Sequence, residues 1–446
     1  MARQMKDSGV EWIGDIPQDW SVSATKYLFN IQSGTTPDSK KEEFWDGDIK
    51  WVTPADFKTD DVYVKQGRRN ISDLGFSSCS LQIIPTGSII FSKRAPVGSV
   101  VINNTDLSIN QGCLACMNKG QSDTKYYYYV MAIATEQYEL HSSGTTFKEI
   151  SAYTFSNFKL PHPPNDRQRV IADYIDAKAS LICKVVDQTR ATIEEYKKLK
   201  QAIITEAVTK GVRGPRPMKP SGVEWIGDIP VGWYTSKAGR FIASTQNGLT
   251  RRDLSESSGD IVLKLRNITP DGTIDYSAVT RVKLSDAEKT AYTLEKGDFL
   301  FVRVNGSKSL VGKSAIFDGS DEDVAYNDHI IRVRLETNYS RAYFKWFLLS
   351  TPGKTEIDMR TSTSAGQFTI SGQELRNIRL CVPSEEEQQE IATYLDAKCA
   401  EIDRIIQKKE QLIEELGSYK KSLIYEYVTG KKEVKTNMEL KVPRSN

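Results

Sequence analysis

A sixteen-residue segment occurs twice in the chain, almost unchanged. Residues 5–20 read MKDSGVEWIGDIPQDW and residues 218–233 read MKPSGVEWIGDIPVGW, so thirteen of the sixteen positions are identical. A looser pair follows: LPHPPNDRQRVIADYIDAK at residues 160–178 returns as LCVPSEEEQQEIATYLDAK at residues 380–398. Solenoid and propeller repeats recur every ~20–50 residues, a far shorter period. The sequence therefore predicts that a whole unit, domain and helix together, is duplicated.

The composition is that of a soluble protein. Of 446 residues, 39% are hydrophobic and 26% charged, and the net charge of +2 gives no basic excess that would point to nucleic acid. No stretch approaches the ~18 apolar residues of a membrane span, and the N-terminus lacks the apolar core of a secretory signal. We therefore expect a cytoplasmic protein with reduced cysteines and no membrane partner.

Strand and turn signals fill residues 21–157 and 234–377. Turn residues at 46–48 and 85–87 each precede a short apolar run, and Tyr126–Ala134 has the texture of a buried helix. Each half is thus expected to hold an α+β domain with a curved antiparallel sheet. The segment before the first domain is expected to be extended and partly buried, with Trp12 and Trp20 as anchors.

After each domain, apolar residues recur at helical spacing. The first helix is expected to begin at an N-cap, Asn165, with Gln168 three residues later, and to end at Gly211. In the second half, Ser384 with Glu387 forms a capping box and Gly430 ends the helix. Each helix would measure about 65 Å and needs a partner for its apolar stripe.

The two helices are the obvious partners of each other, and pairing of a duplicated unit favours an antiparallel arrangement. Thr189 and Lys409 occupy equivalent positions and interrupt the apolar stripe of each helix. Such polar residues either fix the register of a coiled coil or simply face water, and the sequence leaves both explanations open.

The chain contains only near misses to catalytic motifs. Residues 306–314 resemble a phosphate-binding loop with the wrong glycine spacing. Asp38, Asp56 and Lys58 match a loose nuclease pattern, but Pro54 stands where that pattern needs a strand. Cys113 and Cys116 form a lone CxxC pair in an apolar run, which favours core packing over a metal site. We predict no catalytic residue and no metal ligand.

The remaining polar groups gather in loops of both halves. Arg and Lys neutralise phosphates and reach guanine edges, whereas Asn and Gln pair with adenine. Any one such residue is more often a solvated surface group, so the prediction depends on their clustering. The candidates for DNA contact are Thr35, Lys50, Lys93, Arg94 and Gln111 in the first half, and Arg251, Arg252, Arg266, Asn267, Arg303, Asn305 and Lys308 in the second.

With these features the sequence resembles the specificity (S) subunits of type I restriction–modification enzymes. The resemblance covers residues 5–430 and depends on repeated motifs in a fixed order. These are GVEWIGDIP…W at 9–20 and 222–233, the helix starts at 163–178 and 383–398, and the domain segments SGTTP at 33–37, SKRAPVG at 92–98 and RVNGS…LVGK at 303–313.

The resemblance implies two tandem target-recognition domains, each a curved β-sheet with helices, separated by two long antiparallel helices in a pseudo-two-fold coiled coil. We expect the first domain with its lead-in at 1–158, a spacer helix at 159–212, the linker, second lead-in and second domain at 213–378, the second spacer helix at 379–430, and a mobile tail at 431–446.

The resemblance also implies the partners: double-stranded DNA, two methyltransferase (M) subunits and motor–nuclease (R) subunits. S-adenosylmethionine, ATP and Mg²⁺ would belong to those subunits, and this chain would be a non-catalytic subunit that binds no cofactor. The lead-ins and helices would bind the M subunits. The candidates for that contact are Trp12, Ile171, Tyr174, Trp225, Ile391 and Tyr394.

A nearly verbatim frame around two unlike domains favours an asymmetric, bipartite DNA target, with the helices setting a half-site separation of about one DNA turn, ~34 Å. Two alternatives remain. A structural adaptor would share the helices but not use the polar loops for DNA. An autonomous nuclease would use Asp38, Asp56 and Lys58 with Mg²⁺.

Overall fold

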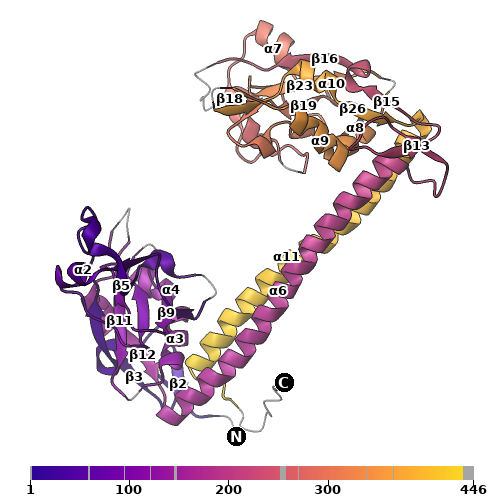
Figure 1. Cartoon of the computed structure of the whole chain (residues 1–446). Helices are drawn as coiled ribbons and strands as arrows, with labels where there is room; N and C mark the ends of the chain where they lie inside the picture. The colour runs from indigo at the N-terminus through magenta and orange to yellow at the C-terminus, as the bar shows by residue number, and fades with distance from the viewer. Residues whose placement is uncertain are drawn as a thin grey trace. The chain divides into compact units, whose positions relative to one another are not determined.

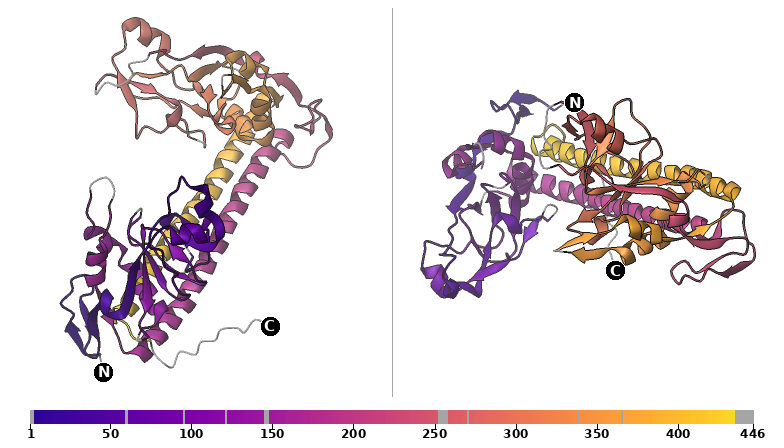
Figure 2. Two further views of the ribbon diagram at one scale, coloured as in Figure 1. Left: turned by 60° about the vertical axis from the view of Figure 1, so that its left-hand side comes forward. Right: turned by 90° about the horizontal axis from the view of Figure 1, so that it is seen from above.

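The computed structural model describes residues 3–434 except residues 59–60, 95, 121, 145–147, 252–257, 270, 338 and 365. The chain divides into two compact units. The first consists of Met1–Thr189 with Gln411–Asn446, and the second of Arg190–Glu410. Each unit holds one α+β domain and one stretch of each long helix (Figures 1 and 2). The predicted α+β class is confirmed.

The domain of the first unit is built on a five-stranded sheet. Its strand order is β4–β11–β8–β9–β6, and only the β6–β9 pair is parallel. A second sheet, β10–β5–β7, contains another parallel pair, β10–β5. The bounds are β4 Phe29–Ser33, β5 Trp45–Val52, β6 Tyr63–Val64, β7 Arg69–Ile71, β8 Ile89–Ser92, β9 Val100–Asn103, β10 Ser108–Ile109 and β11 Cys113–Asn118.

The domain of the second unit also has a larger sheet and a three-stranded sheet, but its strands differ in number and length. Its sheets are β16–β23–β19–β21, antiparallel throughout, and β18–β17–β22, in which β17 and β22 are parallel. A third sheet, β20–β25–β24, has no counterpart among the named strands of the first unit. The bounds are β16 Ile242–Asn247, β17 Asp260–Leu263, β18 Thr280–Val282, β19 Phe299–Val302, β20 Val304–Asn305, β21 Ser314–Ile316, β22 Val324–Tyr326, β23 Ile330–Leu335, β24 Ser362–Ser364 and β25 Gln367–Thr369.

The curved antiparallel sheet expected from the sequence is only partly correct, because parallel pairs occur in both units. The turn expected at residues 46–48 is also wrong in detail. Strand β5 runs through it from Trp45, with Asp46 at φ 60° and a shift in register between Trp45 and Ile49. The residues between Trp45 and Ile49 form a bulge in the strand, and a bulge has the same Gly- and Asp-rich composition as a turn.

Short hairpins and two-stranded pairs frame each domain. The lead-ins form β1 Met5–Asp7 with β2 Asp15–Pro17, and β13 Met218–Pro220 with β14 Asp228–Pro230. Beside them, β3 Ser21–Ala24 pairs with β12 Lys159–His162, and β15 Tyr234–Lys237 pairs with β26 Arg379–Val382. Trp20 and Trp233, which end the lead-ins, are almost fully buried. The extended, anchored lead-in is confirmed.

Short helices and 3₁₀ turns complete each domain. In the first unit they are α1 Thr25–Leu28, α2 Asp73–Ser77, α3 Thr124–Ile133, α4 Thr135–Leu140 and α5 Ala152–Asn157, with the 3₁₀ turns η1 Glu42–Phe44 and η2 Pro54–Asp56. In the second they are α7 Asp286–Tyr292, α8 Arg341–Leu349, α9 Thr351–Arg360 and α10 Gly372–Asn377, with η3 Ala238–Arg240, η4 Leu265–Asn267 and η5 Lys308–Leu310. The buried helix expected near Tyr126–Ala134 is α3.

Helix α6, Asn165–Lys210, and helix α11, Glu385–Val428, follow the two domains. In the first unit, the rings of Tyr174 and Tyr427 lie 4.6 Å apart. In the second unit, the Lys200 ammonium lies 2.6 Å from an Asp403 carboxylate oxygen. A second contact in each unit gives the direction: Lys420 lies 3.3 Å from Cys183 in the first unit, and Lys409 lies over the Tyr196 ring in the second. Within each unit, residue numbers therefore rise along one helix as they fall along the other, and the pairing is antiparallel. Among the helices of the described chain, none is long and apolar enough to cross a membrane.

Both long helices end as the sequence predicts, at Gly211 (φ 79°) and Gly430 (φ 74°), in the left-handed conformation that glycine adopts without strain. The predicted start of α6 is wrong by one residue. The Pro164 carbonyl accepts from the N–H groups of Arg167 and Gln168 at 2.9 and 3.1 Å, so Pro164 is the cap and Asn165 the first helical residue.

Gln168 does not cap the helix but fastens it to the domain. Its side-chain carbonyl accepts from the Asp123 N–H at 2.8 Å, and its amide donates to the Pro163 carbonyl at 2.9 Å. Gln388, the equivalent residue of α11, accepts from the Ser340 N–H at 3.0 Å and donates to Pro383 at 3.2 Å. Both side chains are almost fully buried. In each unit this glutamine holds the domain helix, α3 or α8, at a fixed position on the long helix.

The second predicted cap is half correct. Ser384 accepts from the Glu387 N–H at 3.3 Å, as a capping serine should. Glu387 does not complete the box, because its carboxylate accepts from the Trp233 indole N–H at 2.8 Å and pairs with Arg216. In the first unit the equivalent of Glu387 is Arg167, and Trp20 has no hydrogen-bond partner for its indole among the described residues.

The two polar residues of the stripe differ. Thr189 is 8% exposed and donates to the Val185 carbonyl at 2.7 Å, which excludes the explanation that it faces water. Lys409 is half-buried, and its ammonium lies 5.9 Å from the centre of the Tyr196 ring. Their role in fixing the helix register stays a prediction.

Candidate nucleic-acid interface

The two domains share a frame of main-chain hydrogen bonds around one edge of their sheets. In the first unit, the Lys93 N–H donates to the Gly112 carbonyl at 2.8 Å, and the Lys93 carbonyl accepts from Ile150 at 3.1 Å. In the second unit, Arg303 makes the same two bonds with His329 at 2.7 Å and Ile370 at 3.0 Å. Lys93 and Arg303 are thus equivalent residues held by equivalent backbone.

A close-packed glycine marks the same edge in both units. The Gly34 N–H donates to Cys113 at 3.3 Å, and the Gly248 N–H donates to Ile330 at 3.1 Å. A side chain at either glycine would lie 2.2 Å from a carbonyl oxygen of the facing loop, so only glycine allows this approach. Backbone packing at these two glycines therefore helps to hold the neighbouring loops in place.

In the first unit, Lys93 and Arg94 are brought together but share one carboxylate. The Lys93 ammonium lies 3.1 Å from Glu149, and the Arg94 guanidinium lies 4.0 Å from the same residue. The Lys93 side chain is only 14% exposed. Glu149 was not foreseen from the sequence, because it comes from a distant loop. It neutralises part of the positive charge that made these two residues candidates.

Thr35 and Gln111 lie on the same edge. The Thr35 carbonyl accepts from the Trp51 indole N–H at 3.3 Å, and the hydroxyl of its neighbour Thr36 is hydrogen bonded to the exposed Gln111. Lys50 lies on β5, opposite Asn70 of β7, and is half-buried.

In the second unit, the Arg303 guanidinium donates to the Asp328 carbonyl at 3.2 Å, which holds the side chain along the edge. Asn305 lies next to it in β20, and its side-chain oxygen accepts from the Ser307 N–H at 3.0 Å. Lys308 begins the 3₁₀ turn η5 and is exposed. The three residues therefore lie along the segment 303–308 that follows β19.

Two other candidates of the second unit are held by neighbours. Arg251 donates to the Lys283 carbonyl at 3.1 Å and lies 3.8 Å from Glu288. Asn267 is 2% exposed, its side-chain oxygen accepts from the Lys264 N–H at 2.9 Å, and its amide donates to Asp275 at 2.8 Å. Its amide group is fully used inside the protein, so we remove Asn267 from the candidates. Arg266, its neighbour, is exposed, and Arg252 lies outside the described residues.

Asp56 occupies the position in the first unit that Asn267 has in the second. Its carboxylate accepts from the Thr53 N–H and hydroxyl, both at 2.8 Å, and from the Arg68 N–H at 3.1 Å. The group therefore stabilises a turn. Throughout the described ranges, no three His, Cys, Asp or Glu side chains are placed to hold a metal ion. The arrangement gives no support to the nuclease alternative.

The CxxC cysteines lie in the core, as predicted. Cys113 and Cys116 are completely buried in β11, and burial raises the pKa of both thiols well above their ordinary value. Thiols that stay protonated are poor metal ligands and poor nucleophiles.

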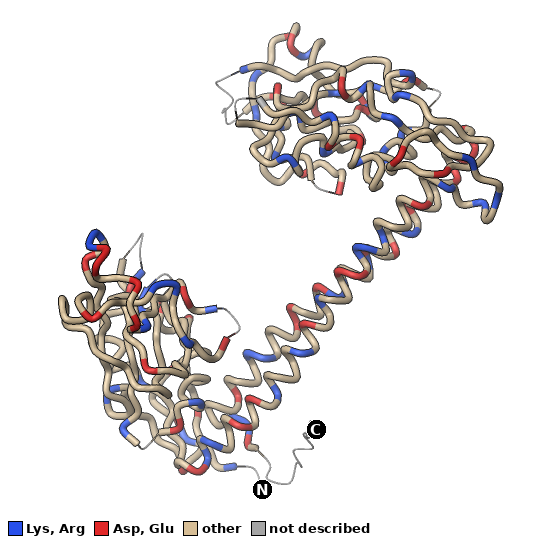
Figure 3. Tube along the Cα trace, viewed as in Figure 1, with Lys and Arg blue, Asp and Glu red and all other residues tan. Residues whose placement is uncertain are grey.

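The distribution of charged side chains explains why the net charge of +2 does not indicate a DNA-binding surface. Figure 3 shows Lys and Arg interspersed with Asp and Glu in both units. Ion pairs on the described surface, such as Arg281 with Glu322 at 2.6 Å, use many of the cations. Among the candidates with described structure, Lys50, Arg266 and Lys308 have no ion pair or side-chain hydrogen bond within the described part of the chain.

The candidates for contact with the M subunits divide into buried and accessible residues. Ile171 and Ile391 are 4% and 0% exposed and pack in the cores of their units, so they are unable to meet a partner without unfolding, and we correct that part of the prediction. Tyr394 is 39% exposed, whereas Tyr174 packs against Tyr427. Trp12, stacked on Phe158, and Trp225 are half-buried against the cores.

Other apolar side chains of the long helices are more exposed. Leu181 and Val185 of α6 are 58% and 37% exposed, and Leu412 and Tyr419 of α11 are 41% and 58% exposed. Each pair is spaced by one or two helical turns, so each lies on one face of its helix. The predicted partner residues belong to the repeated motif, and residues that recur in both halves lie in the core more often than on the surface.

Comparison with known proteins agrees with this architecture. The family model of the type I restriction modification DNA specificity domain matches residues 17–195 and 233–415. The type I restriction enzyme MjaIX specificity subunit of Methanocaldococcus jannaschii is 36% identical over 173 residues, 38% of this chain and 40% of that relative. The type I restriction enzyme StySPI specificity subunit of Salmonella potsdam is 25% identical over 439 residues, 92% of this chain and 89% of the relative.

Solved structures share the fold. A structure described as the basis of complex assembly and conformational transition of the type I R-M system aligns with a TM-score of 0.71 at 15% identity, covering 94% of this chain and 99% of that chain. The HsdS subunit from Thermoanaerobacter tengcongensis aligns with a TM-score of 0.52 at 15% identity, covering 94% and 98%.

The two domains share the same main-chain hydrogen bonds but differ in their exposed side chains, and each is joined to a long helix. This arrangement is a duplicated scaffold for recognition. Because the family model matches most of both halves, the chain belongs to the type I restriction–modification DNA specificity family. It is a specificity subunit with two DNA-recognition domains, as the sequence predicted.

Proposed function

We propose that the chain reads an asymmetric, bipartite DNA target, with one domain for each half of the site. The observation that carries the proposal is the matched frame with unlike side chains. Where the first unit presents Gln111 and an ion-paired Lys93, the equivalent positions of the second hold Asp328 and Arg303. Equivalent backbones with different donors and acceptors contact different base edges.

The long helices set the separation of the two half-sites in this proposal. In each unit a buried glutamine, Gln168 of α6 or Gln388 of α11, bonds the long helix to the DNA-recognition domain. In this proposal the length of the helices therefore determines the distance between the two half-sites. Base pairs between the half-sites go unread. The near-neutral charge fits a chain that shares DNA binding with its partners.

We further propose that two methyltransferase subunits dock on the helix pair and methylate adenine N6 in the target, and that motor–nuclease subunits join them for restriction. S-adenosylmethionine, ATP and Mg²⁺ would be held by those subunits. The exposed apolar side chains of the helices support this docking, because exposed apolar groups on one helix face are typical of protein interfaces. In the first unit they are Leu181, Val185, Leu412 and Tyr419.

Replacing Arg266 with alanine tests the reading function. Arg266 is exposed on η4, the 3₁₀ turn of the second unit that corresponds to η2 of the first, and its guanidinium has no partner in the described structure. If it contacts a base edge, the variant loses about 1–3 kcal/mol of binding to the matched duplex and tolerates substitution of one base pair. The measurement is the affinity of the assembled complex for matched and single-mismatch duplexes.

Arg281→Ala is the matched control, because the Arg281 guanidinium is already held by Glu322. It should bind all duplexes like the parent. Equal loss on every sequence, with a shallower salt dependence, would assign Arg266 to a phosphate. Unchanged affinity on every duplex would remove Arg266 from the recognition surface. Unchanged affinity in all variants of Lys50, Arg266 and Lys308, with partner binding intact, would favour the adaptor function.

A further inference from the structure

A charged side chain is buried in the second domain without a carboxylate beside it. Arg332 lies on β23, an inner strand of its sheet, and is only 7% exposed. Its guanidinium donates to the side-chain carbonyl of Gln246 on β16, and its Nε has no partner in the described structure. Among the described residues Arg332 makes no ion pair, whereas Arg334, two residues further along β23, is paired with Asp298 at 2.8 Å.

The position of this cation is energetically unfavourable. An arginine that leaves water loses its hydration, and a neutral amide replaces only part of it. Folded proteins keep such groups mainly where function requires them. The burial of Arg332 therefore makes it a candidate for a functional role.

The first domain has no cation at the corresponding position. In the antiparallel pairing of β4 with β11, Gln32 lies opposite Ala115. In the pairing of β16 with β23, Gln246 lies opposite Arg332. Each glutamine stands two residues before the close-packed glycine of its domain, so the two glutamines are equivalent. What differs between the domains is the residue beside them, alanine in the first and arginine in the second.

The two glutamines turn their amide groups in opposite directions. The Gln32 amide nitrogen donates to the Ser33 carbonyl at 3.1 Å, so its side-chain oxygen is left to accept. Arg332 has only donors, so the Gln246 oxygen must face it and the amide nitrogen is left to donate. Neither of the two remaining atoms has a partner in the described chain, and neither is buried.

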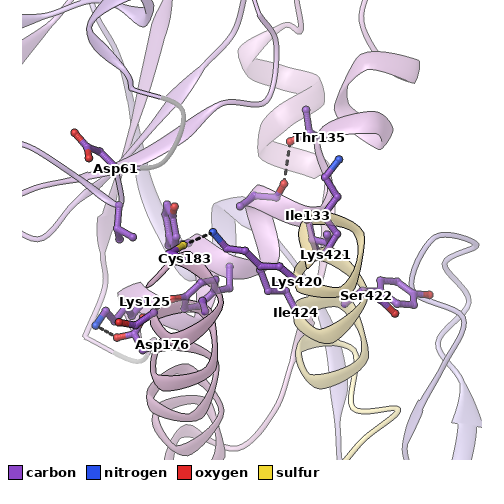
Figure 4. Close-up of a pocket in the computed structure, with 18 of the residues that line it drawn as sticks. Asp61, Lys125, Ile133, Thr135, Asp176, Cys183, Lys420, Lys421, Ser422 and Ile424 are labelled. Atoms are coloured by element: carbon purple, nitrogen blue, oxygen red, sulfur yellow. Dashed lines mark hydrogen bonds and ion pairs between the residues drawn. The ribbon is translucent and has the colours of Figure 1, made fainter. Parts of the chain in front are cut away.

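Both glutamines lie near the edge where the candidates for DNA contact gather. Strands β4 and β16 are the outer strands of their sheets, and each glutamine is the last residue but one of its strand. A groove of about 1380 Å³ in the first unit lies elsewhere, because α3, the start of α4, β6 and the two long helices line it and Gln32 does not (Figure 4). Gln32 therefore meets solvent at an open strand edge, as contact with a DNA groove requires.

We propose that Arg332 is a positioning residue for base recognition: it fixes the Gln246 amide so that the second domain presents a hydrogen-bond donor where the first presents an acceptor. The proposal rests on the proposed function and deepens it, because it names one specificity determinant of the second half-site. A donor selects a base edge with an acceptor, such as guanine N7 or thymine O4. An acceptor, as at Gln32, selects the amino group of adenine or cytosine.

Gln246→Glu tests the proposal with almost no change in shape. One glutamate oxygen accepts from Arg332 as the amide oxygen does, now with an opposite charge that favours the contact. The other oxygen accepts where the amide nitrogen donated. Gln32→Glu is the matched control for the added negative charge, because the atom that the first domain presents is already an oxygen.

Two variants of Arg332 separate its positioning role from its packing. Arg332→Met fills similar space but removes the donor, so the Gln246 amide is free to turn and presents either atom. Arg332→Lys keeps a donor toward the Gln246 oxygen and should restore the parent preference.

Each variant is assembled with the methyltransferase subunit, and its affinity is measured for the parent target and for duplexes with one base pair replaced. We expect Gln246→Glu to prefer, by about tenfold, a duplex changed at one base pair of the second domain's half-site. Arg332→Met should bind that duplex and the parent target almost equally. Arg332→Lys and Gln32→Glu should keep the parent preference.

Unchanged base preference in Gln246→Glu and Arg332→Met would overturn the proposal and leave the proposed function standing. A change in Gln246→Glu alone would also overturn it, because Gln246 would then read a base without help from Arg332. Equal loss of affinity on every duplex would assign Arg332 to the fold alone and overturn the proposal. A parent complex that prefers no duplex over any other would instead overturn the proposed function.

Discussion

Glu387→Ala is expected to destabilise the second unit by about 3–5 kcal/mol, the cost of removing one member of a buried ion pair. The Glu387 side chain is 6% exposed and that of Arg216 is 21% exposed. Without the carboxylate, the partners left to the guanidinium among the described residues are the Lys210 carbonyl, at 2.9 Å, and the Trp233 ring. The buried Trp233 indole also loses its acceptor. Urea denaturation followed by tryptophan fluorescence measures the loss.

Arg167→Ala is the matched control, because Arg167 holds the equivalent position in the first unit. Its guanidinium is 41% exposed and lies 3.8 Å from Glu433, which is 50% exposed. An exposed pair of this kind contributes about 0–1 kcal/mol. If the two alanine variants shift the denaturation midpoint by equal amounts, the buried cluster of the second unit is not what fastens its lead-in to α11.

Leu181→Asp is expected to weaken methyltransferase docking at the first unit by about 2–4 kcal/mol, the range of a central interface residue. Leu181 is 58% exposed on α6, one turn from the exposed Val185. A carboxylate in the middle of an apolar contact would be buried without a partner. Because the side chain faces solvent in the free chain, the stability of the chain itself should change little.

Tyr153→Asp serves as the control for this variant. Tyr153 is 80% exposed, but it lies on the short helix α5 of the domain and not on the helix pair. The measurement is the affinity for purified methyltransferase subunit, together with the thermal stability of each variant. Docking that is lost in Tyr153→Asp but kept in Leu181→Asp would move the interface from the helices to the domain.

The duplication and the long helices could be predicted because each leaves a local mark on the sequence. A repeated segment is visible at any distance, and glycine ends a helix through its own backbone freedom, as Gly211 and Gly430 do. The fold class follows from these marks and from the change in apolar period at residue 165. Such features need no knowledge of what packs against them.

The candidate site was less predictable because its properties depend on residues distant in sequence. Glu149 decides how much of the charge of Lys93 is available, and no local pattern connects the two. Asn267 reads as a polar loop residue, yet the structure uses its amide to close a turn. Glu387 has the spacing of a capping box, but Trp233 and Arg216 compete for its carboxylate.

The most direct test of the central claim is a map of modified adenines. The chain is co-expressed with its methyltransferase subunit, and methylation of host DNA is determined at single-base resolution. We expect one asymmetric split motif, methylated on both strands and lost when this chain is omitted. Exchanging residues 21–157 for those of another specificity subunit should change only one half of the motif. A complex that forms but methylates no new motif, or a motif that does not change on the exchange, would contradict the assignment of one half-site to each domain.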